Sequence, residues 1–142
     1  VKHRLQFVGE HNGVKFYNDS KATNPVATTT ALSGFENNII LVCGGKDRGI
    51  DFKELVPFFP RIKAMVVVGE SKEILFALAS ANGVECHRAK KVDDATVFAN
   101  KLAKSGDIVL LSPACASWDQ YRCFEDRGDE FIATFEKISQ ED

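Results

Sequence analysis

Ile39-Ile40-Leu41-Val42-Cys43 decides the fold class, because all five residues are apolar and three of them are β-branched. Ala64-Met65-Val66-Val67-Val68 repeats this pattern, and Ile108-Val109-Leu110-Leu111 is a shorter apolar run. Continuous runs rich in Val and Ile are typical of strands buried on both faces of a parallel sheet. Val84-Glu85-Cys86-His87 is short and mixed, so it predicts a weaker and more peripheral strand.

The segments between these runs carry start and stop signals of helices. Asn24 before Pro25 predicts a helix N-terminus, and Gly34 can end that helix. Asp51-Phe52-Lys53-Glu54 has the form of a capping box, and Pro57 limits the helix that follows. The inward faces expected of the later helices are Ile74, Leu75 and Leu78 after Ser71, then Val97, Phe98 and Leu102 after Asp93-Asp94, and finally Phe131, Ile132 and Phe135.

A β-hairpin is predicted upstream of these elements. Leu5-Gln6-Phe7-Val8 and Val14-Lys15-Phe16-Tyr17 alternate in part across Asn12-Gly13, a pair typical of tight β-turns. From there strands and helices alternate up to a polar tail, residues 139–142, which we expect to fray. Such alternation requires right-handed crossovers. The sequence therefore predicts a single α/β domain with an N-terminal hairpin, a mostly parallel sheet and helices on both faces.

The composition excludes several classes of protein. With 142 residues, 44% of them apolar and 27% charged, the chain has the size and content of one folded domain. A net charge of −2 offers no basic field to nucleic acid or anionic lipid. No apolar run approaches the length of about 20 residues that spans a bilayer. The N-terminus has neither a signal-peptide pattern nor an initiator Met, so we expect a piece of a larger protein.

The cysteines and histidines do not suggest a metal or disulfide framework. Cys43, Cys86, Cys115 and Cys123 form no CxxC pair and share no metal-ligand spacing with the three histidines. Reduced thiols in a cytoplasmic protein, with no bound metal, are the expected state.

Ligands bind outside the carboxyl ends of the strands in sheets of this kind. The segments that leave the predicted strands should therefore gather at one edge of the sheet. They are rich in small, polar and charged residues, and they cover residues 18–24, 44–49, 69–71 and 112–117.

The first of these segments, Asn18-Asp19-Ser20-Lys21-Ala22-Thr23-Asn24, runs into a helix N-terminus. Free backbone N–H groups there favour anions, Lys21 adds a positive charge, and Ser20 and Thr23 add hydroxyl donors. Asp19 is suited to accept hydrogen bonds from ribose hydroxyls. The alternative is a capped turn in which Asp19 and Ser20 bond their own backbone, because turns and phosphate sites use the same residue types. No Walker loop occurs in the chain.

The second segment, Gly44-Gly45-Lys46-Asp47-Arg48-Gly49, allows a ligand to approach the backbone closely. Arg48 has the fork geometry that grips a carboxylate or phosphate through paired hydrogen bonds. A solvated glycine turn remains the alternative.

In the third segment Ser117-x-x-Gln120 has the spacing of a capping box, which would start a helical turn and point the Ser117 hydroxyl at the same edge. Cys115 is interpreted as a packed thiol, because the sequence identifies no base for it. Trp118 and Tyr121 fit a packing role better than a ligand stack.

Together these loops resemble one family, the Mur ligases, and within it the members that add D-glutamate. The resemblance spans nearly the whole chain. It rests on residues 3–4, 11–14, 18–24, 44–45, 51–52, 110–117, 119–120, 124–125 and 127–128.

The resemblance implies a three-domain ATP-dependent ligase of which residues 1–142 are the Rossmann-like, C-terminal, amino-acid-binding domain. The UDP-binding domain and the central ATPase domain are then absent from this chain, which is expected to be inactive alone. The implied reaction joins D-glutamate to UDP-N-acetylmuramoyl-L-alanine through an acyl phosphate, as part of peptidoglycan synthesis in the cytoplasm. ATP and Mg²⁺ serve the full-length enzyme, and most phosphate and magnesium contacts belong to the central domain.

The resemblance also implies roles for individual residues. Lys21 corresponds to a lysine near the phosphates and the reacting acyl group, and Arg48 replaces a lysine that grips a glutamate carboxylate. The residues expected to contact ATP are Arg4, His11, Asp19 and Lys21, and those expected to contact D-glutamate are Thr23, Arg48, Ser117, Trp118 and Phe124.

Two alternatives stay open at this point. One is a free-standing nucleotide-binding module that regulates a partner, and the other is a sibling ligase specific for a different amino acid.

Overall fold

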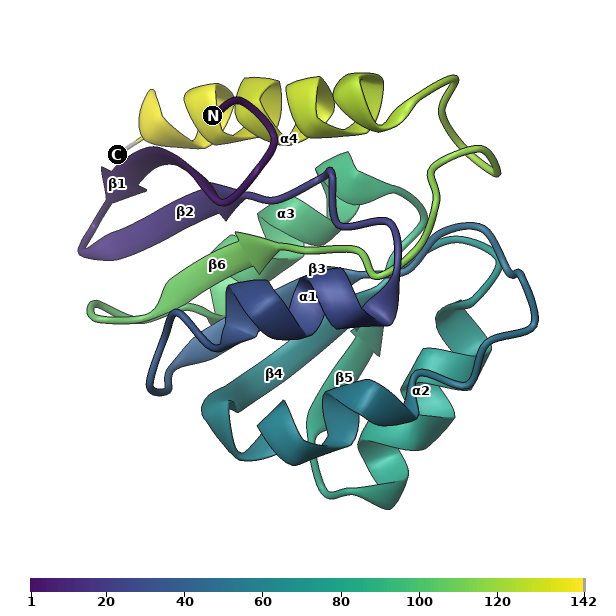
Figure 1. Ribbon diagram of the computed structural model, residues 1–142. Helices are drawn as coiled ribbons and strands as arrows, with labels where there is room; N and C mark the ends of the chain where they lie inside the picture. The colour runs from purple at the N-terminus through teal and green to yellow at the C-terminus, as the bar shows by residue number, and fades with distance from the viewer. Residues whose placement is uncertain (142) are drawn as a thin grey trace.

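The computed structural model describes residues 1–141 and contains one six-stranded sheet with the order β1-β2-β6-β3-β4-β5 (Figure 1). Only β1 runs antiparallel to its neighbour, while β2, β6, β3, β4 and β5 are mutually parallel. The strands are β1 Gln6–His11, β2 Val14–Asn18, β3 Ile39–Cys43, β4 Ile62–Val67, β5 Glu85–Arg88 and β6 Ile108–Leu111. The α-helices are α1 Pro25–Leu32, α2 Lys72–Ala81, α3 Val92–Leu102 and α4 Phe124–Ser139, and η1 Lys53–Arg61 is a 3₁₀ helix.

Helices cover both faces of the sheet, as predicted from the alternation of strands and helices. Alternate residues of β3 face opposite layers: Ile39 and Leu41 pack in the core beneath α1, η1 and α2, whereas Ile40 and Val42 pack in the core beneath α3 and α4. All five residues of β3 are buried, because the strand lies in the middle of the sheet with a helical layer on each side. The predicted fold class is confirmed.

The predicted hairpin is also confirmed. Asn12 and Gly13 both have positive φ, of 52° and 79°, which gives the turn the twist that joins β1 to β2. The expected peripheral strand is β5, at the edge of the sheet beyond β4.

The segment after β3 differs from the prediction. The capping box at Asp51 was expected to start an α-helix limited by Pro57, but residues 53–61 form a 3₁₀ helix that runs through both Pro57 and Pro60. Each proline removes a backbone donor, so the regular i→i−4 ladder is not available. Asp51 instead accepts a hydrogen bond from the Lys53 N–H at 3.2 Å, and Phe52 is buried with φ of 62°.

Helix α2 packs Leu75 and Leu78 inward as predicted but leaves Ile74 exposed, whereas α3 turns a mostly different face inward from the one predicted. Val97 and Phe98 of α3 are 40% and 36% exposed, and Ile74 of α2 is 38% exposed. The buried face of α3 is built from smaller residues, Val92, Ala95, Thr96 and Ala99, which let the helix approach the sheet closely. Apolar spacing alone did not distinguish these two faces. In α4, Phe131 and Phe135 are buried as expected, whereas Ile132 is only half-buried and belongs to neither core.

Helix α4 continues through Ser139, so the predicted fraying of the C-terminal tail does not begin there. Asp142 lies outside the described residues. Along the described part of the chain, no helix is long and apolar enough to cross a membrane.

The strand order creates a switch point between β6 and β3. After β3 the chain proceeds outward through β4 and β5, and it then returns by α3 to place β6 on the other side of β3. Loops that leave neighbouring strands toward opposite layers open a crevice at the carboxyl edge of the sheet. In Figure 1 this edge is on the right, where the segments after β2, β3 and β6 lie side by side.

Candidate anion-binding site at the carboxyl edge of the sheet

Backbone hydrogen bonds join the three predicted loops into one surface. Gly44 N donates to Pro113 O and Lys46 N donates to Ala116 O, both at 2.9 Å. Asp19 N donates to Leu111 O at 2.7 Å, which connects the loop after β2 to the end of β6, where the third loop begins. The segments that begin at Asn18, Gly44 and Ser112 therefore converge, as expected for loops at one end of a parallel sheet.

The three loops enclose a small pocket, which we call the Thr23 pocket. Its volume is about 260 Å³, smaller than the pockets of about 300–1,000 Å³ that hold drug-sized ligands. Two of its lining residues, Lys21 and Arg48, are cationic and none is acidic. Within residues 1–141 neither cation forms an ion pair. The pocket is lined by Lys21, Thr23, Arg48, Ala116, Ser117, Trp118, Cys123 and Phe124.

Ser117 lines this pocket and has a buried hydroxyl. The residue is 1% exposed, and among the described residues its Oγ has no hydrogen-bond partner. The expected turn forms, because Gln120 N and Tyr121 N both donate to Ser117 O. The expected capping box does not form: the Gln120 amide donates to Lys90 O instead. Buried polar atoms are nearly always paired, so an unpaired hydroxyl on a residue that lines the pocket is a candidate ligand contact.

Arg48 and Trp118 form one wall of the Thr23 pocket. The guanidinium carbon of Arg48 lies 5.7 Å from the centre of the Trp118 ring, within the range of a cation–π contact. Trp118 is 65% exposed, so the predicted core role for its ring is wrong. Lys46, the other cation of this loop, is paired with Glu70 at 3.3 Å and does not line the pocket.

A second pocket lies on the other side of Lys21, and we call it the Asp19 pocket. Its volume is about 430 Å³. Apolar side chains form one wall, and Arg4, Asp19 and Lys21 supply its charges. The pocket is lined by Arg4, Leu5, Asp19, Lys21, Ala22, Ala27, Thr30 and Ala31. Lys21 thus lines both pockets.

Asp19 is largely engaged by its own chain. It is 5% exposed, its Oδ1 accepts from Leu5 N at 2.9 Å, and its Oδ2 accepts from the Ser112 hydroxyl at 2.7 Å. Burial raises the pKa of the Asp19 carboxyl, while these two hydrogen bonds and the charge of Arg4 oppose that rise. Each oxygen keeps one further lone pair, so the carboxylate can still accept from a ligand in the pocket.

The raised pKa predicts a pH-dependent stability. The folded chain favours the protonated Asp19 carboxyl, so this group contributes stability at pH values below its unfolded-state pKa, and the contribution is lost as pH rises through the higher folded-state value. We expect wild type to gain stability relative to Asp19→Asn as pH falls from about 7 to about 4. Urea denaturation of both proteins across that range measures the difference, with Glu36→Gln as a control for the loss of one exposed carboxylate. A pH-independent difference between wild type and Asp19→Asn would contradict the prediction.

Arg127 of α4 connects the loop after β2 to the loop after β6 through buried hydrogen bonds. It is 1% exposed, and its guanidinium donates to Ser20 Oγ and Cys115 O at 2.9 Å and to Ser20 O at 2.7 Å. Burial lowers the pKa of Arg127 to about 10. Sequence reasoning gave Arg127 no role, although it lies four residues before Phe131 and so shares the inward face of α4.

The Ser20 hydroxyl is not a ligand donor. Ser20 is fully buried, and its Oγ donates to Phe124 O at 2.7 Å while it accepts from Arg127. The expectation of a donor at Ser20 is therefore wrong, because the loop uses this hydroxyl to bind the start of α4. Cys115 is 1% exposed and burial raises its pKa to about 11, which confirms the packed thiol.

His11 does not join the other predicted nucleotide contacts. It is the last residue of β1 and pairs with Val14, the first residue of β2, so it lies at the amino end of the parallel strands. Arg4, Asp19 and Lys21 lie at the carboxyl end. Within this domain His11 therefore lies at the other end of the parallel strands from these three residues, because the hairpin turn joins β1 to β2 there. Its contact with ATP stays a prediction for the full-length protein. Among residues 1–141, no group of three or more His, Cys, Asp or Glu side chains is placed to hold a metal ion.

Comparison with known proteins identifies the family. Residues 3–115 match the family model described as "Mur ligase, glutamate ligase domain". This chain belongs to that family. The Mur ligase domain is 58% identical over 132 residues to a protein named UDP-N-acetylmuramoylalanine--D-glutamate ligase from Shouchella clausii, and the match covers 93% of the chain. It spans only 29% of that relative's length.

Solved structures share the fold of this Mur ligase domain. A murein peptide ligase from Psychrobacter arcticus superposes with a TM-score of 0.66 at 19% identity, over 94% of this chain and 30% of that one. A bifunctional folylpolyglutamate synthase/dihydrofolate synthase from Yersinia pestis, complexed with AMPPNP and Mn, superposes with a TM-score of 0.62 at 17% identity, over 97% of this chain and 31% of that one. At these identities the likeness concerns the fold.

Proposed function

We propose that this Mur ligase domain is the C-terminal, amino-acid-binding domain of the ligase that joins D-glutamate to UDP-N-acetylmuramoyl-L-alanine. The observation that carries the proposal is that Lys21 lines two adjacent pockets at the carboxyl edge of the sheet. A ligase must bring an activated acyl group and an incoming amine together, and a cation between two pockets is suited to their meeting point. The name of the Shouchella clausii relative supports the same reaction.

The Thr23 pocket is proposed to hold D-glutamate. The ligand has two carboxylates, and the pocket offers Lys21, Arg48 and the unpartnered Ser117 hydroxyl without a competing acid. Arg48 can bind a carboxylate through two parallel hydrogen bonds, which a lysine at that position could not do. Thr23 and Phe124 complete the wall next to Lys21, and the exposed ring of Trp118 keeps Arg48 over the pocket.

The Asp19 pocket is proposed to receive the adenosine part of ATP. Its apolar wall suits a base, and Asp19 retains acceptor capacity for ribose hydroxyls. Arg4 and Lys21 supply positive charge on the side toward the phosphates. ATP supplies the phosphoryl group that activates the muramoyl-alanine carboxylate. The Yersinia pestis protein, 31% of which matches this chain, is complexed with AMPPNP and Mn, which supports the use of a nucleotide by the full-length ligase. We assign Mg²⁺ to the rest of the ligase.

The rest of the reaction is proposed to depend on other domains of the full-length protein. We assign UDP binding and the ATPase centre to them, so residues 1–142 alone should catalyse no ligation. Closure of this domain against the central domain would bring the Thr23 pocket to the acyl group and exclude water. We further propose that the ligase acts in cytoplasmic peptidoglycan synthesis, and through it in cell shape and division. The four free thiols agree with a reducing compartment.

Ser117→Ala tests the glutamate pocket. Removing a buried hydroxyl that has no partner is expected to raise the free energy of unfolding of this chain by about 1 kcal/mol. The same change removes a hydrogen bond to a carboxylate, so the KM of the full-length ligase for D-glutamate should rise by a factor of about 10 to 100. Urea denaturation and steady-state kinetics measure the two effects.

Ser112→Ala is the matched control for stability. Its buried hydroxyl donates to Asp19 Oδ2 at 2.7 Å and lies 3.0 Å from Thr28 Oγ1, so its removal should destabilise the fold. The proposal fails if Ser117→Ala destabilises the chain as Ser112→Ala does and leaves the KM for D-glutamate unchanged. A substrate panel on the full-length enzyme would reveal a sibling ligase, because another amino acid would then replace D-glutamate.

A further inference from the structure

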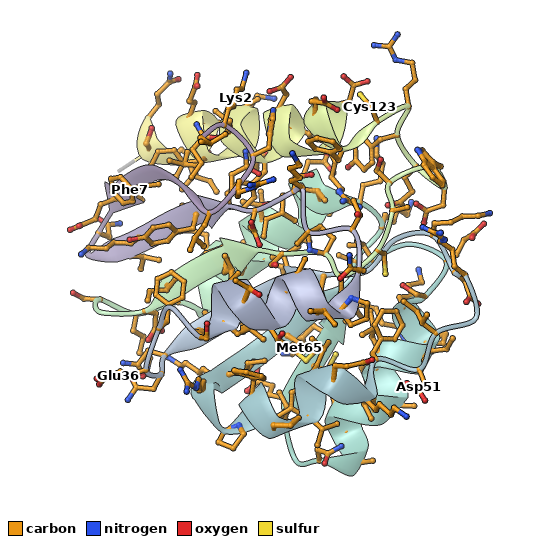
Figure 2. All side chains as sticks on the ribbon, viewed as in Figure 1. Lys2, Phe7, Glu36, Asp51, Met65 and Cys123 are labelled. Carbon is orange, nitrogen blue, oxygen red and sulfur yellow. The ribbon has the colours of Figure 1, made fainter. Side chains whose placement is uncertain are left out.

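Cys123 is the one cysteine among the residues that line the Thr23 pocket. The residue is half-buried, is the N-cap of α4, and lines the pocket together with Lys21 and Arg48. Its side chain makes no capping hydrogen bond, so the sulfur is not used to satisfy the helix. Figure 2 shows Cys123 where the last loop meets α4, at the carboxyl edge of the sheet.

The other three thiols are poor nucleophiles. Cys43 is fully buried, and burial raises its pKa well above the usual value. Burial also raises the pKa of Cys86 and Cys115 to about 11. The thiolate is the reactive form of cysteine, so these residues should react slowly.

A second feature of the pocket indicates what kind of molecule would reach Cys123. Ser117 is 1% exposed and lines the same cavity of about 260 Å³, and its hydroxyl has no partner among the described residues. With Lys21 and Arg48 it forms a set of donors suited to a carboxylate. A small ligand held by these groups would occupy the same cavity that Cys123 lines.

We propose that Cys123 is a covalent modification site for small, carboxylate-bearing soft electrophiles, which the Thr23 pocket captures before they react. For a haloacid, the Cys123 thiolate attacks the carbon that carries the halogen. The sulfur–carbon bond forms as the carbon–halogen bond breaks, the halide leaves with the bonding electron pair, and the thiol proton goes to solvent. The adduct fills the pocket and excludes D-glutamate. This inference rests on the proposed carboxylate-binding role of the pocket.

The test compares iodoacetate with iodoacetamide, which differ in the carboxylate. Second-order rates of alkylation at Cys123 are measured on this chain by peptide mass mapping and expressed as the ratio of iodoacetate to iodoacetamide. The same ratio for N-acetylcysteinamide gives the intrinsic preference of a free thiol. Because one charge-assisted hydrogen bond strengthens binding by about tenfold or more, we expect the ratio at Cys123 to exceed the free-thiol ratio at least about tenfold. D-glutamate should slow the iodoacetate reaction.

Two variants show whether the labelling depends on the Cys123 sulfur and on the positive charge of Arg48. Cys123→Ser should abolish the fast labelling, and Arg48→Met should reduce the ratio toward the free-thiol value while iodoacetamide labelling continues. If neither reagent labels Cys123, the modification site is refuted, while D-glutamate kinetics of the full-length enzyme still test the proposed function separately. If both reagents label it at the free-thiol ratio, the capture step is refuted and the anion pocket itself is contradicted.

Discussion

Replacing Lys21 by methionine in the full-length ligase is expected to lower kcat by a factor of about 10²–10³. Lys21 is exposed, lines both pockets and forms no ion pair within residues 1–141, so its charge is free to act on a ligand. Its backbone is fixed, because Lys21 N donates to His3 O at 2.9 Å. A fixed cation between nucleotide and amino acid stabilises the negative charge that develops as the amine attacks. Steady-state kinetics with saturating substrates measure the loss.

Lys46→Met is the matched control for the Lys21 variant. Lys46 lies at the same edge of the sheet but is paired with Glu70 at 3.3 Å and lines neither pocket. Its replacement should leave kcat nearly unchanged. Unfolding of the isolated chain should be little affected by either change, because neither side chain is buried. Equal kcat values for the two variants would refute a catalytic role for Lys21.

Arg127→Ala is expected to lower the free energy of unfolding by about 3–5 kcal/mol. The change removes three hydrogen bonds of 2.7–2.9 Å and leaves Ser20 O and Cys115 O buried without these donors. Loss of the buried side chain also leaves a cavity where the loop after β2, the loop after β6 and α4 meet. Urea denaturation of the chain, monitored by the fluorescence of Trp118, measures the loss.

Arg127→Lys separates the charge from the geometry. A lysine retains the cation but lacks the planar fork that reaches three acceptors, so we expect a loss of about 1–3 kcal/mol. Arg122→Ala is the exposed control: its side chain is 88% exposed and pairs with Asp126 at 3.1 Å, so its removal should be barely measurable. Equal stability of wild type and Arg127→Ala would show that the buried guanidinium does not hold the loops together.

The strands of the core were predictable because each carries its own pattern. Ile39–Cys43 is apolar at every position, and the structure places it between two helical layers. Asn12-Gly13 specified a tight turn through the backbone conformation that it allows. The prediction failed where two faces of a helix both carried apolar residues. Val97 and Phe98 have helical spacing but lie on the exposed side of α3.

The candidate site was predictable in outline only. The rule for the carboxyl ends of parallel strands brought Lys21, Arg48 and Ser117 to one edge before their distances were known. The same rule did not show which hydroxyls form hydrogen bonds within the chain. The Ser20 hydroxyl donates to Phe124 O, whereas the Ser117 hydroxyl has no partner among the described residues. Cys123 had no sequence signal beyond its place before α4.

The sequence by itself determined the class of the fold, the hairpin and the segments that meet at the functional edge, because hydrophobic period, turn residues and crossover handedness act over short stretches of chain. Only the tertiary structure decided that β6 lies between β2 and β3, that His11 is carried to the far edge, and that Arg127 ties α4 to the Lys21 loop. These features depend on contacts between distant residues, such as Ser20 and Arg127, which are 107 positions apart. Such contacts form only when the whole sheet and both helical layers are assembled.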